Sequence, residues 1–514
     1  MAAAQPTPPG EIRHHGLITL SLMLATIMQV LDTTIANVAL PSMRADLGAS
    51  SDTINWVLTS YIVAAAIVTP LSGWLSERYG RKEVFVTSVA GFVLTSMLCG
   101  IAWSLETMVL FRMAQGVFGA AIVPLSQTFL LDINPREKHG QAMAMWGAGI
   151  MVGPIIGPTL GGYLTETLNW RWVFYINVPL GAIALAGCMA YLPNMARRLR
   201  RFDFIGFAML GLGVGALQLM LDRGAEVDWF AATEIWIELA LALTGFWVFV
   251  VWINGVEHPF LDPKMFLDRN FATGLVFIFV VGIVLLASLA LLPPMLSVIF
   301  GYPVMTTGLV MAPRGVGTMA SMILAGKLVR LVDPRKLVVT GLGLTSVSLW
   351  MMTGFSPQMN ATPIVLSGLV QGLGLGLVFV PLSTVAFATI NPQLRGDATA
   401  LFSLVRNIGS SIGISAVTVL LTHNVAVNHS ELAASLTPER IAALAANGPG
   451  LAQQGQGVLW AMLDQLVTVQ ALMISYVDDF KAMMWVTLAA IPLAALLRKP
   501  EAQPPGAAPA AHMD

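Results

Sequence analysis

An isolated acidic residue, Asp32, interrupts one of the long apolar runs of this sequence. The run from residue 17 to residue 40 contains no other ionisable side chain. A carboxylate at that depth in hydrocarbon costs about 3 kcal/mol unless it faces water or takes up a proton. Burial favours the neutral acid and an approaching cation favours the carboxylate, so such a group can carry protons. A packing role, with the carboxylate hydrogen-bonded to Thr33 or Asn37, is the alternative.

Three arginines also lie inside apolar runs, at positions 112, 314 and 406. A guanidinium keeps its charge, so each arginine needs a carboxylate, a carbonyl or water beside it. Arg112 precedes Gln115 and Gly116 by about one helical turn, so these residues share a face that can point into a helix bundle. Arg112 is therefore the best functional candidate of the three, whereas a structural role is as consistent as a functional one for Arg314 and Arg406.

The elements that must position these residues are membrane-spanning helices. Of the 514 residues, 56% are apolar and 11% are charged, and the mean hydropathy is +0.75. In soluble domains roughly a quarter of all residues are charged. The 27 basic and 28 acidic residues nearly cancel and give no indication of a nucleic acid partner. Runs of about 20 apolar residues can span a bilayer. They predict an all-α integral membrane protein of fourteen helices, near residues 17–40, 54–75, 84–103, 106–131, 140–165, 172–192, 204–222, 235–254, 271–296, 304–329, 337–354, 361–389, 399–421 and 481–497.

The basic residues predict the orientation of these helices, because lysine and arginine gather on the cytoplasmic side of a membrane. With the N-terminus inside, the cytoplasmic segments hold 18 of the 27 basic residues and the opposite segments hold five. The first apolar run has no small-residue cleavage site within reach and is interpreted as a retained helix. We therefore expect a multi-pass protein of the inner membrane with both termini in the cytoplasm.

An internal repeat divides the chain into two halves. Gln115-Gly116, Pro124-Leu125-Ser126 and Ile133-Asn134-Pro135 recur at an offset of 256 to 257 residues, the last as Ile390-Asn391-Pro392. Parallel repeats of this kind build transporters with a binding site between the halves. The predicted parts are a cytoplasmic tail (1–16), a six-helix half (17–192), a basic linker (193–203), two inserted helices (204–254), a second linker (255–270), a second six-helix half (271–497) containing an outer loop (422–480), and a cytoplasmic tail (498–514).

One predicted helix carries glycines at intervals of four, with two prolines at the same spacing. Such a ridge permits close helix packing, and it can form either an ordinary tight contact or a seam that moves. No spacing of His, Cys or carboxylates indicates a metal site, and no glycine-rich loop ends in Lys-Ser or Lys-Thr. The sequence therefore predicts no metal, no cofactor and no ATP site. The ridge consists of Gly149, Gly153, Pro154, Gly157, Pro158 and Gly161.

Several motifs together resemble the major facilitator superfamily, in particular its fourteen-helix EmrB-type drug:proton antiporters. The first-helix motif runs from Leu31 to Pro41, the loop motif from Gly73 to Lys82, and the fourth-helix motif from Arg112 to Gly116. The glycine ridge is similar to the motif that marks exporters in that superfamily. The segment from Leu221 to Gly224 is similar to EmrB-type proteins. The resemblance covers nearly the whole chain.

The resemblance implies roles for these motifs. Asp32 would be the protonation site and Arg112 would tune proton exchange, with the proton motive force as the only energy source. The loop motif would act in gating, although Glu77 stands where the family usually has aspartate. EmrB-type pumps work with a periplasmic adaptor (an EmrA-like membrane fusion protein) and a TolC-like outer-membrane channel. The expected gating residues are Gly73, Glu77, Arg78, Gly80, Arg81 and Lys82.

The outer loop is the surface where such an adaptor would dock. From Leu459 its apolar residues keep helical spacing, which predicts a helix that extends beyond the bilayer and joins the last span. A short helix is also predicted between Thr437 and Gly448. The alternative to adaptor docking is that the apolar stripe packs on the loop itself or on the ends of other spans.

We therefore expect proton-coupled efflux of hydrophobic drugs by alternating access. A narrower exporter of a fatty acid, a siderophore or another natural product is the alternative within transport. A membrane-embedded lipid enzyme or flippase is an alternative of a different class, for which no catalytic motif is found. Methionine and aromatic side chains suit varied hydrophobic ligands. The expected cavity lining is Met28, Gln29, Gln115, Gln127, Trp146, Met151, Asn177, Phe379, Phe402 and Arg406.

Overall fold

The structure, a computed structural model, describes residues 14–50, 52–195, 197, 200–437 and 456–497. Every regular element in those segments is a helix, as expected where lipid leaves backbone groups no other partner. The first part of the chain forms α1 (His15–Asp46), α2 (Trp56–Val68), α3 (Leu71–Tyr79), α4 (Arg81–Gly100), α5 (Leu105–Gly119), α6 (Ile122–Ile133), α7 (His139–Ile150), α8 (Val152–Thr167), α9 (Trp172–Tyr175), α10 (Asn177–Tyr191), α11 (Phe204–Arg223) and α12 (Thr233–Gly255).

The second part of the chain has longer, less interrupted helices. They are α13 (Arg269–Val298), α14 (Val304–Leu328), α15 (Pro334–Met352), α16 (Thr362–Ala388), α17 (Arg395–Ala434) and α19 (Gln456–Ala490). Short 3-10 helices accompany them at η1 (Arg136–Lys138), η2 (Trp229–Ala231), η3 (Pro263–Leu267), η4 (Pro392–Leu394) and η6 (Ile491–Leu496).

Prolines break four of the predicted spans into two helices each. The breaks precede α3, α6, α8 and α10, and each has a proline at or near the start of the following helix: Pro70, Pro124, Pro154 and Pro179. A proline fits the first turn of a helix but removes a hydrogen bond farther inside it. The sharpest bend, 57°, lies between α2 and α3.

Twelve helices in the described residues are long and apolar enough to cross a membrane, or thirteen if the bent pair of α2 and α3 is counted as one span. The remaining predicted span, 337–354, corresponds to α15, whose first turn contains Arg335 and Lys336. The helix exists, but it is not among the spans identified by length and composition. The count of fourteen therefore stays a prediction.

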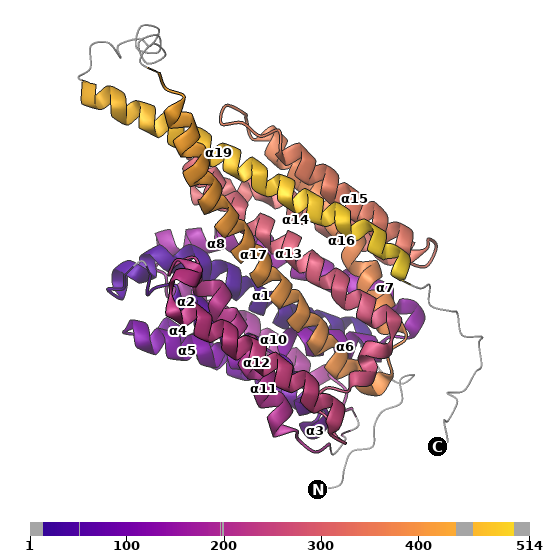
Figure 1. Ribbon diagram of the computed structural model, residues 1–514. Coiled ribbons are helices and arrows are strands. Elements are labelled where there is room, and N and C mark those ends of the chain that lie inside the picture. The colour runs from indigo at the N-terminus through magenta and orange to yellow at the C-terminus, as the bar shows by residue number, and fades with distance from the viewer. Residues whose placement is uncertain (1–13, 51, 196, 198–199, 438–455, 498–514) are drawn as a thin grey trace.

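The helices form two groups that meet along a seam. Figure 1 shows α1 to α10 gathered in one group and α13 to α19 in the other, with α11 and α12 beside the first. Across the seam, α14 packs against α7 and α8, while α17 packs against α3 and α6. The inserted helix α11 contacts both α2 and α17, so it lies against both groups.

Two helices, α17 and α19, project beyond the rest of the bundle (Figure 1). They contain 40 and 35 residues, or about 60 and 52 Å at 1.5 Å per residue, whereas the hydrocarbon core is about 30 Å thick. Asn428 Nδ2 donates to Ser475 Oγ at 3.0 Å between them. The helix predicted from Leu459 is confirmed. Both α17 and α19 continue through the predicted bounds of the outer loop, residues 422 and 480, so the described ends of that segment are helical.

The apolar stripe of the α19 projection is divided between the interior and the surface. Leu463 and Met473 are buried, while Met462 and Leu466 are 43% and 59% exposed. The stripe therefore packs partly on the bundle and leaves part of its apolar surface open. The short helix predicted after Thr437 lies outside the described residues.

Candidate functional site

Asp32 lies in the interior of the first group of helices and is 1% exposed. Its Oδ2 accepts a hydrogen bond from Arg112 Nη1 on α5 at 2.6 Å, which is also an ion pair. Its Oδ1 accepts from Gln115 Nε2 at 3.0 Å and from Asn177 Nδ2 at 2.6 Å. Donors from α5 and α10 therefore hold both oxygens of a carboxylate on α1.

The partner guanidinium of Arg112 is fully buried. Its Nε donates to the backbone oxygen of Val57 at 3.1 Å, and Nη1 also donates to Gln115 Oε1 at 2.7 Å. Its Cζ lies 4.5 Å from the centroid of the Tyr61 ring, a distance at which the ring attracts the cation. The ion pair carries no net charge, and removing one partner of such a buried pair costs about 3–5 kcal/mol.

Local sequence features bring the three helices of the site together. A capping box between Ser104 and Thr107 fixes the start of α5. Gly116 lets α5 approach α2, because a Cβ there would lie only 3.1 Å from Ala64 Cβ. Asn177 is the first residue of α10, and its Nδ2 also donates to Ser96 Oγ on α4 at 2.9 Å.

The structure joins residues that the sequence identified separately. It brings Asp32 to Arg112, and it places two of the expected cavity residues, Gln115 and Asn177, as hydrogen-bond donors to the carboxylate. The alternative partners are wrong: Thr33 Oγ1 donates to the backbone oxygen of Val30, and Asn37 is exposed.

Sequence reasoning missed Tyr61 and Ser96. Gln29, another expected cavity residue, donates to the Tyr61 hydroxyl at 3.2 Å, and Ser96 positions Asn177. No signal in the sequence distinguished these two residues from the other hydroxyl-bearing side chains of the apolar runs.

The glycine ridge forms the contact between α8 and α1. A Cβ at Gly153 would lie 3.0 Å from Val30 Cγ1, and a Cβ at Gly161 would lie 3.3 Å from Ile35 Cα. Gly157 faces Thr34, and Gly149 faces Met23 from the preceding helix, α7. The ridge thus packs along the helix that carries Asp32.

The opposite side of α8 faces the second group of helices. Ile155 and Thr159 of α8 meet Gly315 and Gly308 of α14. Pro154 and Pro158 lie in the same helix, whose first residue follows the break at Met151. Helix α8 therefore lies between α1, which carries Asp32, and the seam with α14.

Replacement of Gly161 by leucine is expected to disrupt this contact. The added side chain would meet the backbone of Ile35, and overpacking of this kind costs about 1–3 kcal/mol. Thermal unfolding in detergent should therefore show a lower midpoint. Gly343→Leu on α15 is the matched control, since nothing lies within 4 Å of a Cβ there. Equal effects of the two substitutions would contradict a specific role of the ridge.

The loop motif takes part in an ionic contact between the groups of helices. Arg200 belongs to the basic linker. Its Nη1 lies 2.7 Å from Asp397 Oδ2 on α17 and 3.7 Å from Glu77 Oε2 on α3. Arg200 Nη2 also donates to the backbone oxygens of Pro259 and Phe260, each at 2.6 Å. We call Glu77, Arg200 and Asp397 the latch.

Packing around the latch is close. A Cβ at Gly73 would lie 2.9 Å from the backbone nitrogen of Asp397, so only glycine lets α3 and α17 meet here. Burial by itself lowers the pKa of Arg200, but Asp397 and Glu77 raise it above its ordinary value. The charge that bridges the two carboxylates is therefore retained.

A second ionic cluster lies beside the latch. Asp132 of α6 pairs with Arg81 of α4 and, at 2.9 Å, with Arg395 of α17. Gly80 joins α3 to α4 with a φ of +104°, a conformation that favours glycine. Lys82 Nζ donates to the backbone oxygen of Met189 at 2.8 Å.

Arg78 is the last of the six expected gating residues, and its side chain is exposed. Asp132, Asp397 and Arg395 were not selected from the sequence, because acidic and basic residues at helix ends are ordinary there. Arg200 was used only as part of the basic linker.

Two of the expected cavity residues stack across the seam. The rings of Trp146 on α7 and Phe379 on α16 have centroids 6.3 Å apart and planes 20° apart. Trp146 Nε1 donates to Ser126 Oγ at 2.9 Å. Gln127 is buried on the same helix as Ser126, and neither polar atom of its side chain has a hydrogen-bond partner in the described residues. The stacked rings thus form a contact between α7 and α16 across the seam.

Other expected lining residues lie elsewhere. Met28 is fully buried and faces Gly181 within the first group, and Phe402 packs on Phe387 within the second at 5.1 Å. Arg406 is half-buried and donates to the Asn407 side chain at 3.4 Å. The ten expected residues therefore do not line one open cavity in this conformation.

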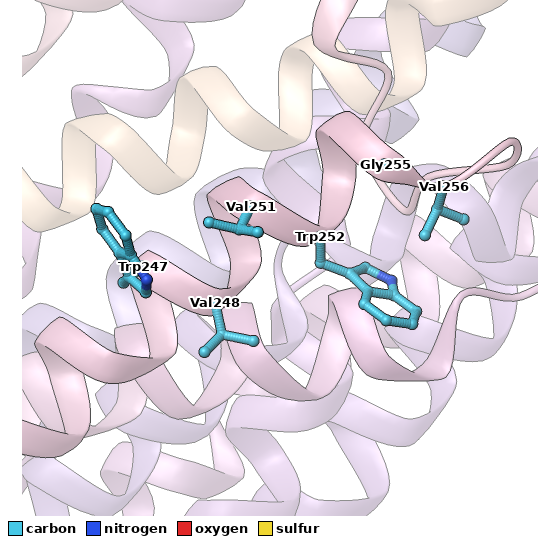
Figure 2. A pocket seen from close by; sticks show the side chains of 6 residues that line it. All are labelled: Trp247, Val248, Val251, Trp252, Gly255 and Val256. Carbon is cyan, nitrogen blue, oxygen red and sulfur yellow. The ribbon is translucent and has the colours of Figure 1, made fainter.

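A shallow hollow lies instead on the outer surface of α12. It has a volume of about 350 Å³ and is lined by residues of one segment, Trp247 to Val256. Figure 2 shows these side chains along α12 and its end. Trp247 is 72% exposed, so the hollow faces the surroundings of the bundle and includes none of the expected cavity residues.

Comparisons with known proteins agree with this architecture. The family model for the Major Facilitator Superfamily matches residues 22–414. Multidrug export protein EmrB of Haemophilus influenzae is 38% identical over 439 residues, covering 85% of this chain and 86% of the relative. Fatty acid resistance protein FarB of Neisseria gonorrhoeae is 34% identical, covering 94% and 96%.

A solved structure shows the same fold. The human organic anion transporter MFSD10 (TETRAN) is 15% identical, with a TM-score of 0.59, and the match covers 94% of this chain and all of that one. With a matched family model over most of its length and close relatives along nearly all of it, this chain belongs to the major facilitator superfamily and, within it, to the EmrB-type proteins.

Proposed function

We propose that this protein exports hydrophobic toxic compounds in exchange for protons, by alternating access between its two halves. The observation that carries the proposal is the buried Asp32–Arg112 ion pair, held by amides inside an apolar bundle. A transporter that uses the proton motive force needs a group that binds and releases a proton in the membrane. The relative named multidrug export protein EmrB supports the choice of substrate.

Protonation of Asp32 removes the charge that attracts Arg112 Nη1 and weakens the bonds from Gln115 and Asn177. Arg112 is then a buried cation without a counter-ion, an unfavourable state that favours rearrangement of α1 and α5. The ridge couples α1 to α8, and α8 contacts α14 across the seam. Each proton that crosses a potential of 100 mV contributes about 2.3 kcal/mol to the cycle.

Opening on one side requires the latch to separate. Arg200 holds Glu77 of the first half and Asp397 of the second, at the end of the bundle where the basic residues predict the cytoplasm. We assign the substrate path to the seam between α7, α8, α14 and α16. The stacked Trp146 and Phe379 would part when the halves rock.

The proposed setting is the inner membrane, with both termini in the cytoplasm. The projecting ends of α17 and α19 would then stand in the periplasm, where an EmrA-like adaptor leading to a TolC-like channel can contact them. The exposed Met462 and Leu466 favour this assignment.

A narrower exporter of fatty acids is the second candidate. It is favoured by the relative named fatty acid resistance protein FarB, which matches this chain over almost its whole length. The lipid enzyme and the flippase receive no support from the family of the chain, which is one of secondary transporters.

Export can be tested with purified protein in proteoliposomes that contain a pH-sensitive dye. With an imposed proton gradient, a cationic hydrophobic dye should move against its gradient while protons move the other way. Dodecanoate distinguishes the second candidate, which predicts exchange with this compound and none with unrelated dyes. Dye transport that persists after an ionophore has collapsed the proton gradient would reject proton coupling.

A further inference from the structure

The internal repeat places a second polar cluster in the second half. Ser288 on α13 stands at an offset of 256 residues from Asp32, and Gln371 on α16 at the same offset from Gln115. The structure joins this pair too, since Gln371 Nε2 lies 3.4 Å from Ser288 Oγ. Both side chains are fully buried. The second half thus retains the amide of the proton site but has a hydroxyl where the first half has its carboxylate.

The cation of this second cluster comes from a different helix. Position 368, the counterpart of Arg112 at the same offset, is glycine, and Arg314 Cβ lies 3.4 Å from a Cβ built there. Arg314 on α14 extends its Nη2 to Ser288 Oγ at 2.9 Å and to the backbone oxygen of Leu285 at 3.1 Å. A guanidinium therefore reaches the hydroxyl that replaces the carboxylate.

The charge of this cluster is not balanced. Arg314 is 5% exposed and forms no ion pair within the described part of the chain. Its Nη1 and Gln371 Oε1 are buried and have no hydrogen-bond partner among the described residues. A buried guanidinium is favourable only with an anion or strong acceptors beside it. The first half supplies that anion from Asp32, whereas the described residues of the second half supply none to Arg314.

We infer that Arg314, Ser288 and Gln371 form a subsite for the carboxylate of an amphipathic substrate. A carboxylate can accept two parallel hydrogen bonds from one guanidinium. Rotation of the Gln371 amide by half a turn would present Nε2 as a further donor, and the two amide orientations cannot be told apart by shape. The substrate carboxylate would then take the place that Asp32 occupies in the first half.

The subsite lies next to the seam that opens during transport. Gly315, the residue after Arg314, faces Ile155 of α8 across the seam. Rocking of the halves therefore changes the surroundings of α14 at this level. The inference rests on the proposed export function for its route of entry, but the binding itself needs no proton gradient.

Equilibrium binding to the purified full-length protein tests the subsite. The ligands are dodecanoate, neutral dodecanamide and cationic dodecyltrimethylammonium, which share one chain and differ in the head group. Wild type should bind dodecanoate most tightly. Arg314→Gln should weaken the binding of dodecanoate by about tenfold or more, because it removes a charge-assisted hydrogen bond. The binding of dodecanamide should be unchanged. Lys327→Gln, which removes an exposed charge from the same helix, is the control.

A second variant keeps the test decisive if Arg314→Gln folds poorly. Ser288→Asp supplies an internal carboxylate to Arg314, so this variant should be at least as stable as wild type. It should also bind dodecanoate more weakly, while its binding of the other two ligands stays the same. Equal loss of all three ligands, or unchanged dodecanoate binding in both folded variants, would overturn the subsite. Competition of chloride or phosphate with dodecanoate as strong as that of another carboxylate would show an inorganic anion site and would overturn it as well.

These results stay separate from those on export. Failure of proton-coupled dye transport by wild type would reject the proposed function, while selective head-group binding would still identify the subsite. Proton-coupled dye transport with no head-group preference in binding would keep the function and reject the subsite.

Discussion

Replacement of Asp32 by asparagine should reduce proton-coupled export to the level of protein-free liposomes. Asparagine keeps the size of the side chain and can still accept a hydrogen bond from Arg112, but it cannot bind and release a proton. The measurement is substrate-driven proton flux in proteoliposomes. Asp333→Asn is the matched control, because Asp333 caps α15 and asparagine caps helices equally well. Full coupled exchange by Asp32→Asn would reject this carboxylate as the carrier.

The same substitution should destabilise the protein in a way that a second substitution relieves. With a neutral residue at position 32, the fully buried Arg112 has no counter-ion, at a cost of about 3–5 kcal/mol in the free energy of unfolding. Arg112→Gln alone should cost a similar amount. The double variant should lose clearly less free energy of unfolding than the two single variants added together, because it leaves no buried charge at these two positions. Additive losses would show that the ion pair does not act as a unit. Transport should be absent from the double variant even where stability returns.

Arg200→Gln is expected to open the latch. Without the guanidinium, the buried Asp397 and Glu77 have no bridging cation, which removes about 3 kcal/mol from the latched conformation. That energy corresponds to about a hundredfold in the ratio of latched to open molecules. The linker residue should therefore control the conformation although it belongs to neither half.

Crosslinking across the halves can measure this shift. Thr128 Oγ1 on α6 and Thr399 Oγ1 on α17 are 2.7 Å apart and both buried. Cysteines at these positions, with Cys99 and Cys188 replaced by alanine, should oxidise readily with Arg200 present and much more slowly in Arg200→Gln. Arg197→Gln is the control, because its ion pair with Glu83 is largely exposed and worth little. Crosslinking that is equally fast in all three backgrounds would show that the latch does not hold the halves together.

The sequence predicted most of the fold because the fold depends on long-range patterns of hydrophobicity. Runs of apolar residues located nearly every helix, and the repeat separated the two halves. The patterns failed where local chemistry decided the outcome. Prolines such as Pro124 and Pro154 split spans that hydropathy reads as continuous. The end of α17 is polar enough to resemble a loop, yet it is helical as far as Ala434 and packs on α19.

The candidate site was predicted as single residues and not as contacts. Asp32 and Arg112 stood out because charges are costly in a membrane. Nothing in the sequence stated that they pair, since 80 residues separate them. The latch was harder to foresee: Arg200 lies in the linker and Asp397 near the start of α17, where charges are common, and only the folded chain shows that they meet. The expected cavity lining stays a prediction, because methionine and phenylalanine side chains fill cores as readily as they line cavities.

The length of α17 connects the latch to the far end of the bundle, which the latch residues themselves do not contact. One uninterrupted helix begins at Arg395, beside Asp397, and ends at Ala434 in the projection. A rod of about 60 Å that pivots near its middle displaces its far end by about 5 Å for roughly ten degrees of tilt. If α17 moves in this way during the proposed cycle, the state of an ion pair at one end of the bundle would be transmitted mechanically to the other end. A protein bound to the projecting end of α17 would then be displaced each time the transporter changes between its inward-facing and outward-facing states.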